Sequence, residues 1–293
     1  MTKEFDFLNI ISKTLSNSSF LGDDCAYLDE YNLALSKDCL IEDVHFSRLF
    51  MTPYEIARKA LLVNISDILV SGAKPKYILI GLCGKFDDDF IKNFYLGINE
   101  TIEKYDIKVI GGDLTKADKI AISITILGDY KNKKISKRQN AKKGYIVATV
   151  GEFGSSAQGL KFLEENKINQ ETKHFIEYHK NPPLFAKICD EISSKAEFPY
   201  AMMDSSDGLF DCLYQISKKS KVKIEVEYDL IPKKIEDKNL VLYGGEDYCP
   251  VVCLNEKDFK KINGLIKIGT VKKGSGVYID NRKEEYRGFK HFE

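Results

Sequence analysis

The stretch TPYEIARKALLVNISDILVSGAKP, residues 52–75, contains the clearest helix signal in this chain. Thr52 is a typical N-cap residue, Pro53 suits the first helical position, and Glu55 is placed to complete a capping box. Gly72 predicts the end of the helix, because glycine readily adopts the left-handed conformation that closes a helix. We therefore expect one long helix that begins after Thr52 and ends just before Gly72.

Three polar side chains, Asn64, Ser66 and Asp67, interrupt an otherwise apolar part of this helix between residues 60 and 70. Asn64 and Asp67 are three positions apart and therefore share one face. A carboxylate in such apolar surroundings is costly unless it is paired or bound to a cation. An ion pair with Lys59 or another base, a helix edge that faces water, and a metal-binding role all remain open for Asp67.

Acidic turns also occur elsewhere in the chain, most of them where an apolar run stops. Because those runs are predicted strands, each turn would deliver carboxylates to a strand end, where the loops of a sheet converge. Oxygen ligands with few histidines or cysteines nearby favour a hard cation such as Mg²⁺, which also leaves room for substrate phosphates. The turns are Gly22-Asp23-Asp24, Ser36-Lys37-Asp38, Gly111-Gly112-Asp113, Asp204-Ser205-Ser206-Asp207-Gly208 and Gly244-Gly245-Glu246-Asp247.

Each of these features has an ordinary structural explanation when it is taken alone. The serines or aspartates of residues 204–208 could cap the helix that is predicted to follow them. Glycine-containing segments such as residues 111–113 and 244–247 are common turns. A lone histidine such as His45 is more often structural than functional. Two aspartates three positions apart nevertheless exceed what a cap requires, and a helix start offers N–H groups to a phosphate oxygen.

Composition excludes several classes of function. Forty-four basic and 44 acidic residues cancel, so no overall field attracts nucleic acid or an anionic membrane surface. The seven cysteines are an odd number without CxxC spacing, which favours reduced thiols in a cytoplasmic protein. The first residues, MTKEFDFLNIISKTL, predict an amphipathic helix rather than a secretory signal. No apolar run approaches the roughly 20 residues that cross a bilayer.

Strand and helix patterns intermix without a regular βαβ rhythm, which predicts an α+β fold with an α/β domain in each half. The polar stretch of residues 131–144 is the best boundary, so we expect domains at residues 1–142 and 143–293. Besides the helix quoted above, helices are expected at 3–15, 88–104, 156–166, 171–178, 183–194, 208–219 and 256–262. Strands are expected at 32–36, 77–83, 107–111, 120–128, 145–150, 199–203, 222–228, 240–243, 249–254 and 265–270.

Several familiar catalytic motifs are absent from the sequence. The chain has no Gly-x-x-x-x-Gly-Lys-[Ser/Thr] phosphate loop, no protein-kinase motif set and no Gly-x-Ser-x-Gly elbow. A phosphoryl-transfer enzyme built from this sequence must therefore rely on metal ions to screen its phosphates.

Taken in order, six motifs closely resemble those of the thiamine-monophosphate kinase family: GDDCA, SKDCLIEDVHF, KALLVNISDILVSGAKP, GGDLT, DSSDGL and GGEDY. That family belongs to a superfamily of ATP-binding proteins that includes aminoimidazole ribonucleotide synthetase and selenophosphate synthetase. The resemblance implies an amino-terminal mixed sheet that pairs across a homodimer, and a carboxy-terminal sheet with helices on one side. It also implies that ATP, held through several Mg²⁺ ions between the domains, phosphorylates thiamine phosphate to thiamine diphosphate.

The resemblance assigns roles to particular residues. Asp67 and Asp207 would act in catalysis through metal ions, without a general base. The implied metal ligands are Asp24, Ser36, Asp38, Asp67, Asp113, Asp204 and Asp207. The implied ATP contacts are Tyr105, Gly112, Asp113, Arg138 and Ser206. The implied thiamine phosphate contacts are His45, Glu246 and Phe289.

Three positions depart from the usual pattern of the family. Lys37 stands where threonine is common, Asp43 where glycine is frequent, and Phe289 where tyrosine is more usual. None of these changes removes an expected acidic ligand. An additional lysine near the metals could lower their occupancy.

Two other functions are compatible with the same pattern. One is a different ATP-dependent reaction of the superfamily, which would activate an oxygen or a selenide. Selenide chemistry is disfavoured, because no glycine-rich amino-terminal segment carries the expected cysteine and lysine. The other is a non-catalytic metal- or nucleotide-binding dimer in which the acids only stabilise the fold.

Overall fold

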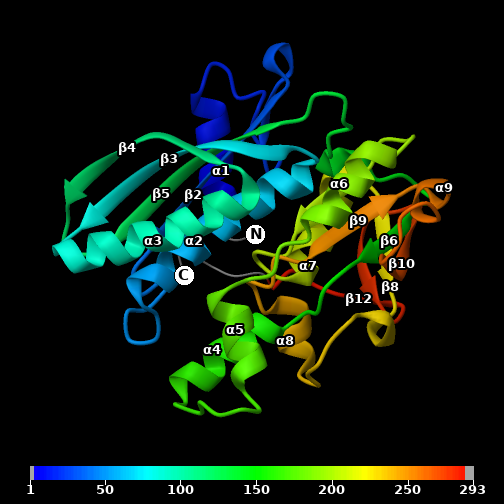
Figure 1. The fold of residues 1–293 in the computed structure, drawn as a ribbon. Coiled ribbons are helices and arrows are strands. Elements are labelled where there is room, and N and C mark those ends of the chain that lie inside the picture. Colours follow the sequence, from blue (N-terminus) through cyan, green and yellow to red (C-terminus); the bar gives the residue numbers. More distant parts are fainter. Residues whose placement is uncertain (1–2, 288–293) are drawn as a thin grey trace.

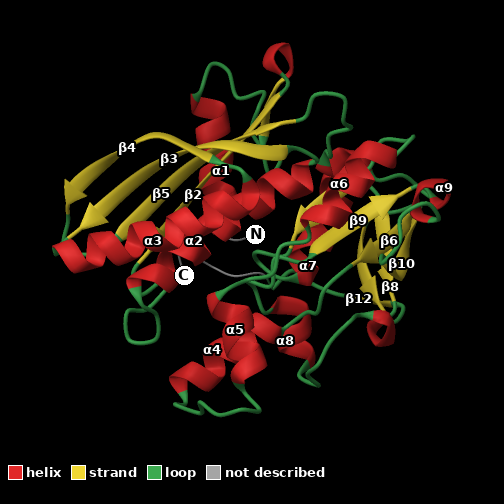
Figure 2. Ribbon diagram, viewed as in Figure 1, coloured by secondary structure: helices red, strands yellow, loops and turns green. Residues whose placement is uncertain are grey.

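The computed structural model describes residues 3–287. It contains two β-sheets, which lie on either side of helix α2 (Pro53–Ser71), as Figures 1 and 2 show. All strands of the first sheet end by residue 129, and those of the second begin at residue 146. The boundary expected at residues 142 and 143 falls in the connection between them.

The amino-terminal half is a five-stranded mixed sheet, and α2 and α3 lie along one of its faces (Figure 1). Its strand order is β1-β2-β5-β3-β4, with β3 and β4 parallel and the other neighbours antiparallel. The remaining elements of this half are α1 (Lys3–Thr14), β1 (Ala26–Leu28), η1 (Asp29–Tyr31), β2 (Leu33–Ile41), β3 (Lys74–Gly84), α3 (Asp88–Tyr105), β4 (Lys108–Lys116) and β5 (Ala121–Asp129).

The carboxy-terminal half is a seven-stranded mixed sheet in the order β12-β11-β8-β10-β6-β9-β7, in which β8 and β11 are parallel. Two mixed sheets with interspersed helices confirm the expected α+β class. The elements are η2 (Arg138–Asn140), β6 (Ile146–Thr149), α4 (Ser155–Glu164), α5 (Lys173–Lys180), α6 (Ala186–Lys195), β7 (Ala201–Asp204), α7 (Leu209–Ser220), β8 (Lys223–Val226), η3 (Tyr228–Leu230), α8 (Lys238–Tyr243), β9 (Pro250–Leu254), α9 (Glu256–Phe259), β10 (Ile266–Lys272), β11 (Gly276–Ile279) and β12 (Arg282–Lys283).

The ends of α2 are those that its sequence predicts. Thr52 Oγ1 accepts a hydrogen bond from the Glu55 backbone at 3.3 Å, and the Glu55 carboxylate accepts one from the Thr52 backbone at 2.7 Å. Gly72 closes the helix with a φ of 93°, a conformation that a side chain would strain. The capping box and the glycine together fix the register in which the polar residues of α2 face the rest of the protein.

Helix α2 is buried between the two sheets, which explains its almost continuous apolar sequence. Fourteen of its 19 residues are buried. Most of its buried apolar residues share one hydrophobic core with Ile124 of the first sheet and with Met202 and Val252 of the second. A helix that packs on two sides must be apolar nearly all round, so each polar residue that it carries needs a partner.

The second sheet is covered on more than one side, so the expectation of helices on one side is incomplete. Phe210 and Leu213 of α7 form a core with Val147 and Val251 on one face. On the other face, Ile192 of α6 belongs to the core that α2 shares with both sheets. The reason is the position of α2, which packs against β7 as well as against the first sheet.

Residues 240–243, expected to be a strand, form most of helix α8. Asp237 caps this helix and accepts hydrogen bonds from the backbones of Asn239 and Leu240 at 2.9 and 3.3 Å. The run NLVLY is too short for its pattern to distinguish a buried strand from a buried helix. The capping hydrogen bonds of Asp237 stabilise the helical conformation of this run.

The first sheet extends further than expected. Ser36 and Asp38 lie inside β2, and Asp113 lies inside β4, rather than in turns that follow shorter strands. Each of these strands pairs along its length with a long neighbour, β5 or β3. Such long-range pairing overrides the local turn signal of glycine and aspartate.

Among residues 3–287, no helix combines the length and the apolar character that a membrane crossing requires.

We predict that Thr52→Ala lowers the free energy of unfolding by about 1 kcal/mol, because the side-chain acceptor of the capping box is lost. Urea denaturation measures this change. Thr52→Ser keeps the hydroxyl and should remain within about 0.5 kcal/mol of the parent protein. Equal losses in the two variants would show that the threonine methyl group, and not the cap, stabilises the start of α2.

Candidate active site

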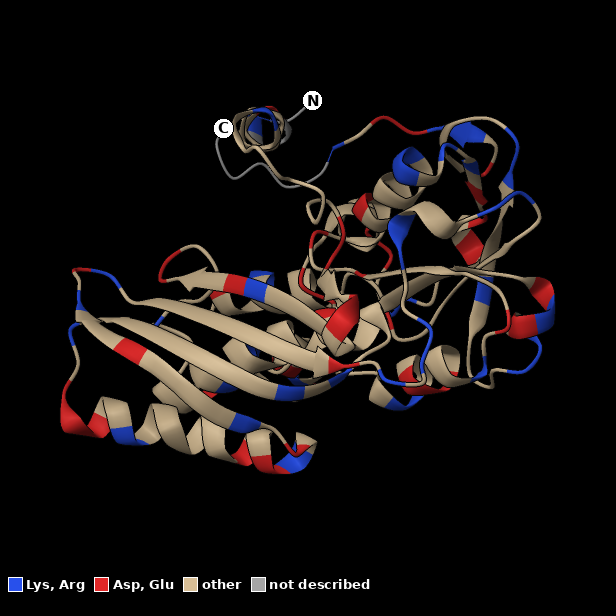
Figure 3. Ribbon diagram, turned by 90° about the horizontal axis from the view of Figure 1, so that it is seen from above, with Lys and Arg blue, Asp and Glu red and all other residues tan. Residues whose placement is uncertain are grey.

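Three carboxylates converge where α2 meets both sheets. Asp24 precedes β1, Asp67 lies on α2, and Asp204 is the last residue of β7, yet each offers a ligand oxygen within 4.8 Å of the others. Figure 3 shows acidic segments gathered in loops at this junction. We call these three residues the acid cluster.

Hydroxyl groups orient two of these carboxylates. Ser36 Oγ of β2 donates to Asp67 Oδ2 at 2.5 Å, and Ser66 Oγ of α2 donates to Asp204 Oδ2. Ser36 and Ser66 therefore connect α2 to one strand in each sheet. The polar residues of α2 interrupt its apolar pattern because they hold the acid cluster together.

Asp38 approaches the acid cluster from β2. Its backbone N–H donates to Asn64 Oδ1 of α2 at 3.2 Å. Asn64 Nδ2 in turn donates to the Ala60 carbonyl at 2.9 Å, so both ends of this buried amide are paired. Asn64 thus fixes the position of β2 relative to α2 and with it the position of Asp38.

Arg138 of η2 brings positive charge to the acid cluster. Its Nη2 donates to Asp24 Oδ1 at 2.7 Å, and its backbone N–H donates to Asp23 Oδ1 at 2.8 Å. Its Nε is buried and has no hydrogen-bond partner among the described residues. The expected nucleotide contact Arg138 therefore lies beside the expected metal ligand Asp24.

Burial and neighbouring negative charge raise the pKa values of Asp38, Asp67 and Asp204. Burial, followed by the charge of Asp24, raises the pKa of Asp38 to about 6 and that of Asp204 to about 7. Burial, followed by the charges of Asp38 and Asp204, raises the pKa of Asp67 well above its usual range. A cation bound among these groups would turn their repulsion into attraction.

The residues at this position fit a divalent cation. The three converging ligand atoms are carboxylate oxygens, the donors that Mg²⁺ prefers. One guanidinium, that of Arg138, pairs with Asp24. Asp67 and Asp204 accept hydrogen bonds from the neutral hydroxyls of Ser36 and Ser66, which do not compensate the charge of a carboxylate.

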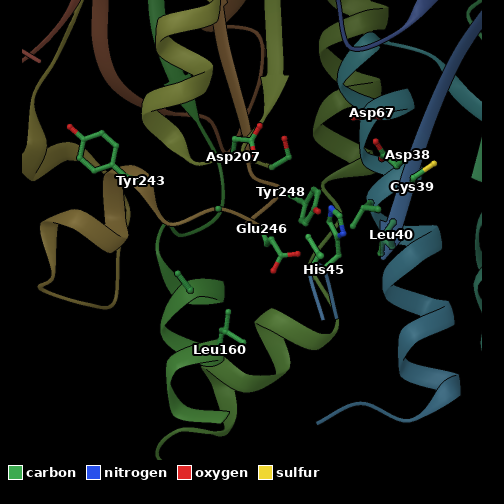
Figure 4. A pocket seen from close by; sticks show the side chains of 15 residues that line it. Asp38, Cys39, Leu40, His45, Asp67, Leu160, Asp207, Tyr243, Glu246 and Tyr248 are labelled. Atoms are coloured by element: carbon green, nitrogen blue, oxygen red, sulfur yellow. The ribbon is translucent and has the colours of Figure 1, made fainter. Parts of the chain in front are cut away.

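A cavity of about 360 Å³ opens beside the acid cluster (Figure 4). Asp38, Asp67 and Asp207 line it together with His45 and Glu246. In Figure 4 the three aspartates lie above His45 and Glu246, so the cavity joins two chemically different regions. Further lining residues include the apolar side chains of Leu40, Val44, Val63, Leu160, Tyr243 and Tyr248.

Ser206 and Asp207 lie in the loop between β7 and α7. The N-cap residue of α7 is Gly208, which has a φ of 98° and no side chain with which to cap. Neither Asp204 nor Asp207 is therefore the N-cap residue of this helix, and the capping explanation does not account for them. Both residues instead belong to the acid cluster or to the cavity wall.

Lys59 of α2 pairs with Glu246, and the alternative in which it neutralises Asp67 is wrong. Its Nζ lies 3.0 Å from Glu246 Oε1 and donates to the His45 carbonyl at 3.2 Å. Eight residues, or about 12 Å of helix, separate Lys59 from Asp67. The two expected substrate contacts His45 and Glu246 are thus brought together around one lysine.

Lys37 points away from the acids. Its Nζ donates to Ser123 Oγ at 2.5 Å and to Thr125 Oγ1 at 3.5 Å on β5. Because side chains alternate along a strand, Lys37 lies on the opposite face of β2 from Ser36 and Asp38. The expectation that this lysine lowers metal occupancy is therefore not supported.

Asp43 has a backbone reason to be glycine in relatives. Its φ is 64°, in the left-handed region that glycine adopts without strain. Its backbone N–H donates to the Phe46 carbonyl at 2.8 Å, and its carboxylate lies 3.2 Å from Lys119 Nζ. Aspartate tolerates this conformation better than most residues, so the turn before His45 is kept.

Gly112 and Asp113 do not reach the acid cluster of their own chain. Successive pairings through β5 and β3 place Asp38 and Gly112 in one row of the sheet. Three strand spacings, or about 14 Å, therefore separate these two positions. Asp113 is the next residue, so its side chain lies on the face opposite the one that carries the Asp38 side chain.

Tyr105 also lies outside the acid-lined cavity. Tyr105 lines a separate cavity, together with Arg58 and Lys104. Phe289 falls outside the described residues. The guanidinium of Arg287, the last described residue, lies 6.0 Å from the ring centroid of Tyr243, which lines the acid-lined cavity.

Sequence reasoning missed Lys59 and His179 as members of the site. A lysine in an almost wholly apolar stretch was a usable signal for Lys59, because unpaired lysines are rarely buried. His179 of α5 lies 3.4 Å from Glu246 Oε2 through Nδ1. No sequence signal connected His179 with Glu246, since their contact depends on how α5 packs against the loop before β9.

The amino-terminal half of the chain matches the AIR synthase-related class of proteins. Residues 22–129 match the family model described as AIR synthase related protein, N-terminal domain. This segment contains β1 to β5, α2 and α3, which supply Asp24, Asp38 and Asp67.

Comparison with individual proteins defines the family more narrowly. The chain is 33% identical over 306 residues to thiamine-monophosphate kinase of Aquifex aeolicus (strain VF5), with 99% of this chain and 98% of the relative covered. It is 36% identical over 269 residues to thiamine-monophosphate kinase of Bacillus subtilis (strain 168), covering 84% of this chain and 81% of that protein. A solved structure of AaThiL complexed with AMPPCP and TMP superimposes with a TM-score of 0.90 at 31% identity, covering 99% and 97% of the two chains. The chain belongs to the thiamine-monophosphate kinase family.

We predict that, without divalent cations, stability falls as the pH rises from about 4 to about 7. The folded-state pKa values of Asp38 and Asp204, about 6 and about 7, lie above the ordinary value of 3.8. The folded protein therefore binds more protons than the unfolded chain in this interval, and raising the pH favours unfolding. Added Mg²⁺ should abolish most of this loss, because it binds the ionised acids.

Thermal unfolding in EDTA and in Mg²⁺ between pH 4 and pH 8 measures this difference. Asp204→Asn removes one of the titrating groups and should flatten the EDTA curve. Parallel curves in EDTA and Mg²⁺ for the parent protein would contradict a cation site at the acid cluster.

Proposed function

We propose that this protein transfers the γ-phosphoryl group of ATP to thiamine phosphate and so forms thiamine diphosphate and ADP. The observation that carries the proposal is the cavity of about 360 Å³ that joins carboxylates at Asp67 and Asp207 to a partly apolar region beside Glu246. Membership of the thiamine-monophosphate kinase family supports it, as does the similarity to AaThiL, which was solved with AMPPCP and TMP.

The acceptor in this reaction needs no general base. A phosphate monoester has a second pKa of about 6, so its oxygens are largely ionised at neutral pH. The obstacle is the approach of two polyanions, since two like charges 4 Å apart repel by about 4 kcal/mol at an effective dielectric constant of about 20. Aspartates that hold cations, together with Arg138, meet this need better than a histidine base would.

The proposed metal ion is Mg²⁺, and several ions are expected. Asp67 and Asp207 are the proposed catalytic residues, acting through the metal. Mg²⁺ held there would screen the phosphates and stabilise charge on the transferring phosphoryl group. The proposed ligands are Asp24, Ser36, Asp38, Asp67, Asp113, Asp204 and Asp207.

The nucleotide is proposed to lie near η2 and the loop before α7. Arg138 offers a guanidinium with one donor, Nε, that has no partner among the described residues. Ser206 lies beside Asp207, close to the first turn of α7 and its free N–H groups. The other proposed ATP contacts are Tyr105, Gly112 and Asp113.

The acceptor is proposed to occupy the lower part of the cavity in Figure 4. Leu160 and Tyr248 offer apolar and aromatic surface to its rings. Glu246 offers a carboxylate that suits the positively charged thiazolium ring. His45 lines the same wall, and Phe289 is proposed to contribute from the end of the chain.

We predict that Asp67→Asn and Asp207→Asn each reduce turnover by at least about 100-fold while the protein remains folded. Each change keeps the shape of the side chain but removes a negative charge that would hold metal. Steady-state assays at saturating ATP and Mg²⁺ measure turnover, and circular dichroism checks the fold. Near-normal activity in both variants would contradict the assignment.

A product assay with purified protein, ATP and Mg²⁺ tests the function itself. We expect thiamine diphosphate when thiamine phosphate is offered, and no turnover with an aminoimidazole precursor or with selenide. Turnover of either alternative acceptor would point to another reaction of the superfamily. Absence of ATP binding by calorimetry would favour acids that only stabilise the fold.

We also propose that the protein is a homodimer formed through the first sheet. Every residue of β4 is exposed, although Val109, Ile110 and Leu114 are apolar. Such an edge strand is an aggregation hazard unless another chain covers it. A second copy seated there would also lie against Gly112 and Asp113, the expected site residues that are remote from the acid cluster of their own chain.

We predict that the double variant Ile110→Glu and Leu114→Glu is monomeric, because four buried charges per dimer would oppose association. Sedimentation velocity measures the mass. Ile168→Glu, an equally exposed apolar residue between α4 and α5, should leave the dimer intact. A monomeric parent protein would contradict the proposed dimer.

A cytoplasmic location is proposed on the basis of the cysteines. All seven thiols are free, and five of them are buried. Free thiols in this number are typical of a reducing compartment. The balanced charge of 44 basic and 44 acidic residues further supports small-molecule substrates rather than nucleic acid or a membrane as partners.

A further inference from the structure

Lys59 is a fully buried lysine that connects the two halves of the chain. Its exposed fraction is 0%, and its Nζ lies 3.0 Å from Glu246 Oε1 and 3.1 Å from Glu246 Oε2. The same ammonium donates to the carbonyl oxygen of His45 at 3.2 Å. It therefore bridges two segments that are about 200 residues apart in sequence and that both line the cavity.

Lys59 itself lies behind the cavity wall. Glu246 and His45 line the cavity, whereas Lys59 is not among its lining residues. The Glu246 side chain is 27% exposed, so it faces the cavity while it remains paired to a buried cation. Any influence of Lys59 on a bound molecule must therefore pass through Glu246 and the His45 segment.

Stability alone does not explain a lysine at this position. A buried ion pair costs desolvation energy, and apolar residues of similar volume often replace such pairs without loss of stability. The neighbouring core of α2 is built from apolar residues such as Ile56 and Val63, which would accommodate one more. The Lys59 ammonium instead pairs with a carboxylate that lines the cavity, that of Glu246.

The backbone of Glu246 adopts an unusual conformation, and a backbone hydrogen bond anchors it there. Its φ is 64°, in the left-handed region that most non-glycine residues avoid. Its N–H donates to the Ser206 carbonyl at 2.6 Å. This hydrogen bond anchors the backbone of Glu246, whereas Lys59 holds its side chain.

His179, another basic side chain beside Glu246, does not replace the charge of Lys59. Burial, followed by the charge of Lys59, lowers the pKa of His179 to about 4, so the ring is neutral near pH 7. Although burial opposes ionisation of Glu246, the charge of Lys59 is the largest of the effects that together lower its pKa. Lys59 therefore keeps the carboxylate ionised.

We propose that Lys59 is a positioning residue for the acceptor, which holds the Glu246 carboxylate and the His45 segment in the geometry that binds thiamine phosphate. This inference rests on the proposed function, because it assigns the acceptor to the part of the cavity that Glu246 lines. Lys59 makes no contact with ATP in this scheme. Its loss affects recognition of the acceptor and leaves recognition of the nucleotide unchanged.

Kinetics of Lys59→Met in the full-length protein test the proposal. We expect the KM for thiamine phosphate to rise about tenfold or more, since the charge-assisted contact between Lys59 and Glu246 is lost and the Glu246 carboxylate is no longer held in place. The KM for ATP should stay within about twofold.

Lys180→Met is the matched control: it removes a neighbouring lysine that pairs with Glu55 instead, and it should change neither KM. Lys59→Gln, which keeps a hydrogen-bond donor, replaces Lys59→Met in these measurements if thermal unfolding shows that the methionine variant does not fold.

A double-mutant cycle with Glu246→Gln separates positioning from general damage. If Lys59 acts through Glu246, the double variant should raise the acceptor KM no further than Glu246→Gln alone. Additive effects, equal rises in both KM values, or an unchanged acceptor KM in Lys59→Met would each overturn the proposal. A parent protein that forms no thiamine diphosphate would instead refute the proposed function.

Discussion

Mutual repulsion among converging carboxylates is the constraint on which the rest of this structure depends. Asp24, Asp67 and Asp204 come from three distant parts of the chain, yet their oxygens lie within 4.8 Å of one another. Carboxylates held this close repel one another, and burial further raises the pKa values of Asp67 and Asp204. A cation placed among these carboxylates would relieve their repulsion.

Helix α2 is the element that makes this arrangement possible. Its apolar surface packs against both sheets, and three of its polar residues, Asn64, Ser66 and Asp67, make hydrogen bonds in or beside the acid cluster. Asn64 holds the backbone of Asp38, Ser66 holds Asp204, and Asp67 accepts from Ser36. A single buried helix thereby fixes two sheets and the acids at their junction, so its capping box and its register matter to the site as well as to stability.

Charge is arranged differently at the two parts of the cavity. Near Asp67 and Asp207, negative charge exceeds what Arg138 offsets, which suits cations and the phosphates that accompany them. Near Glu246, the buried Lys59 compensates a single carboxylate that stays ionised and faces the cavity. The acceptor would need both regions, since it carries a phosphate at one end and a positively charged ring at the other.

The sequence by itself determined the limits of α2, the α+β class and the identity of most acids in the site, because capping, hydrophobic pattern and motif order are local properties. It also named Arg138, His45 and Glu246 through resemblance. Only the tertiary structure decided that Lys59 pairs with Glu246 and not with Asp67, that residues 240–243 are helical, and that Gly112 and Asp113 lie across the sheet from Asp38. These outcomes depend on contacts between segments far apart in the chain, and no local pattern encodes which distant partner a buried charge or an apolar run will meet.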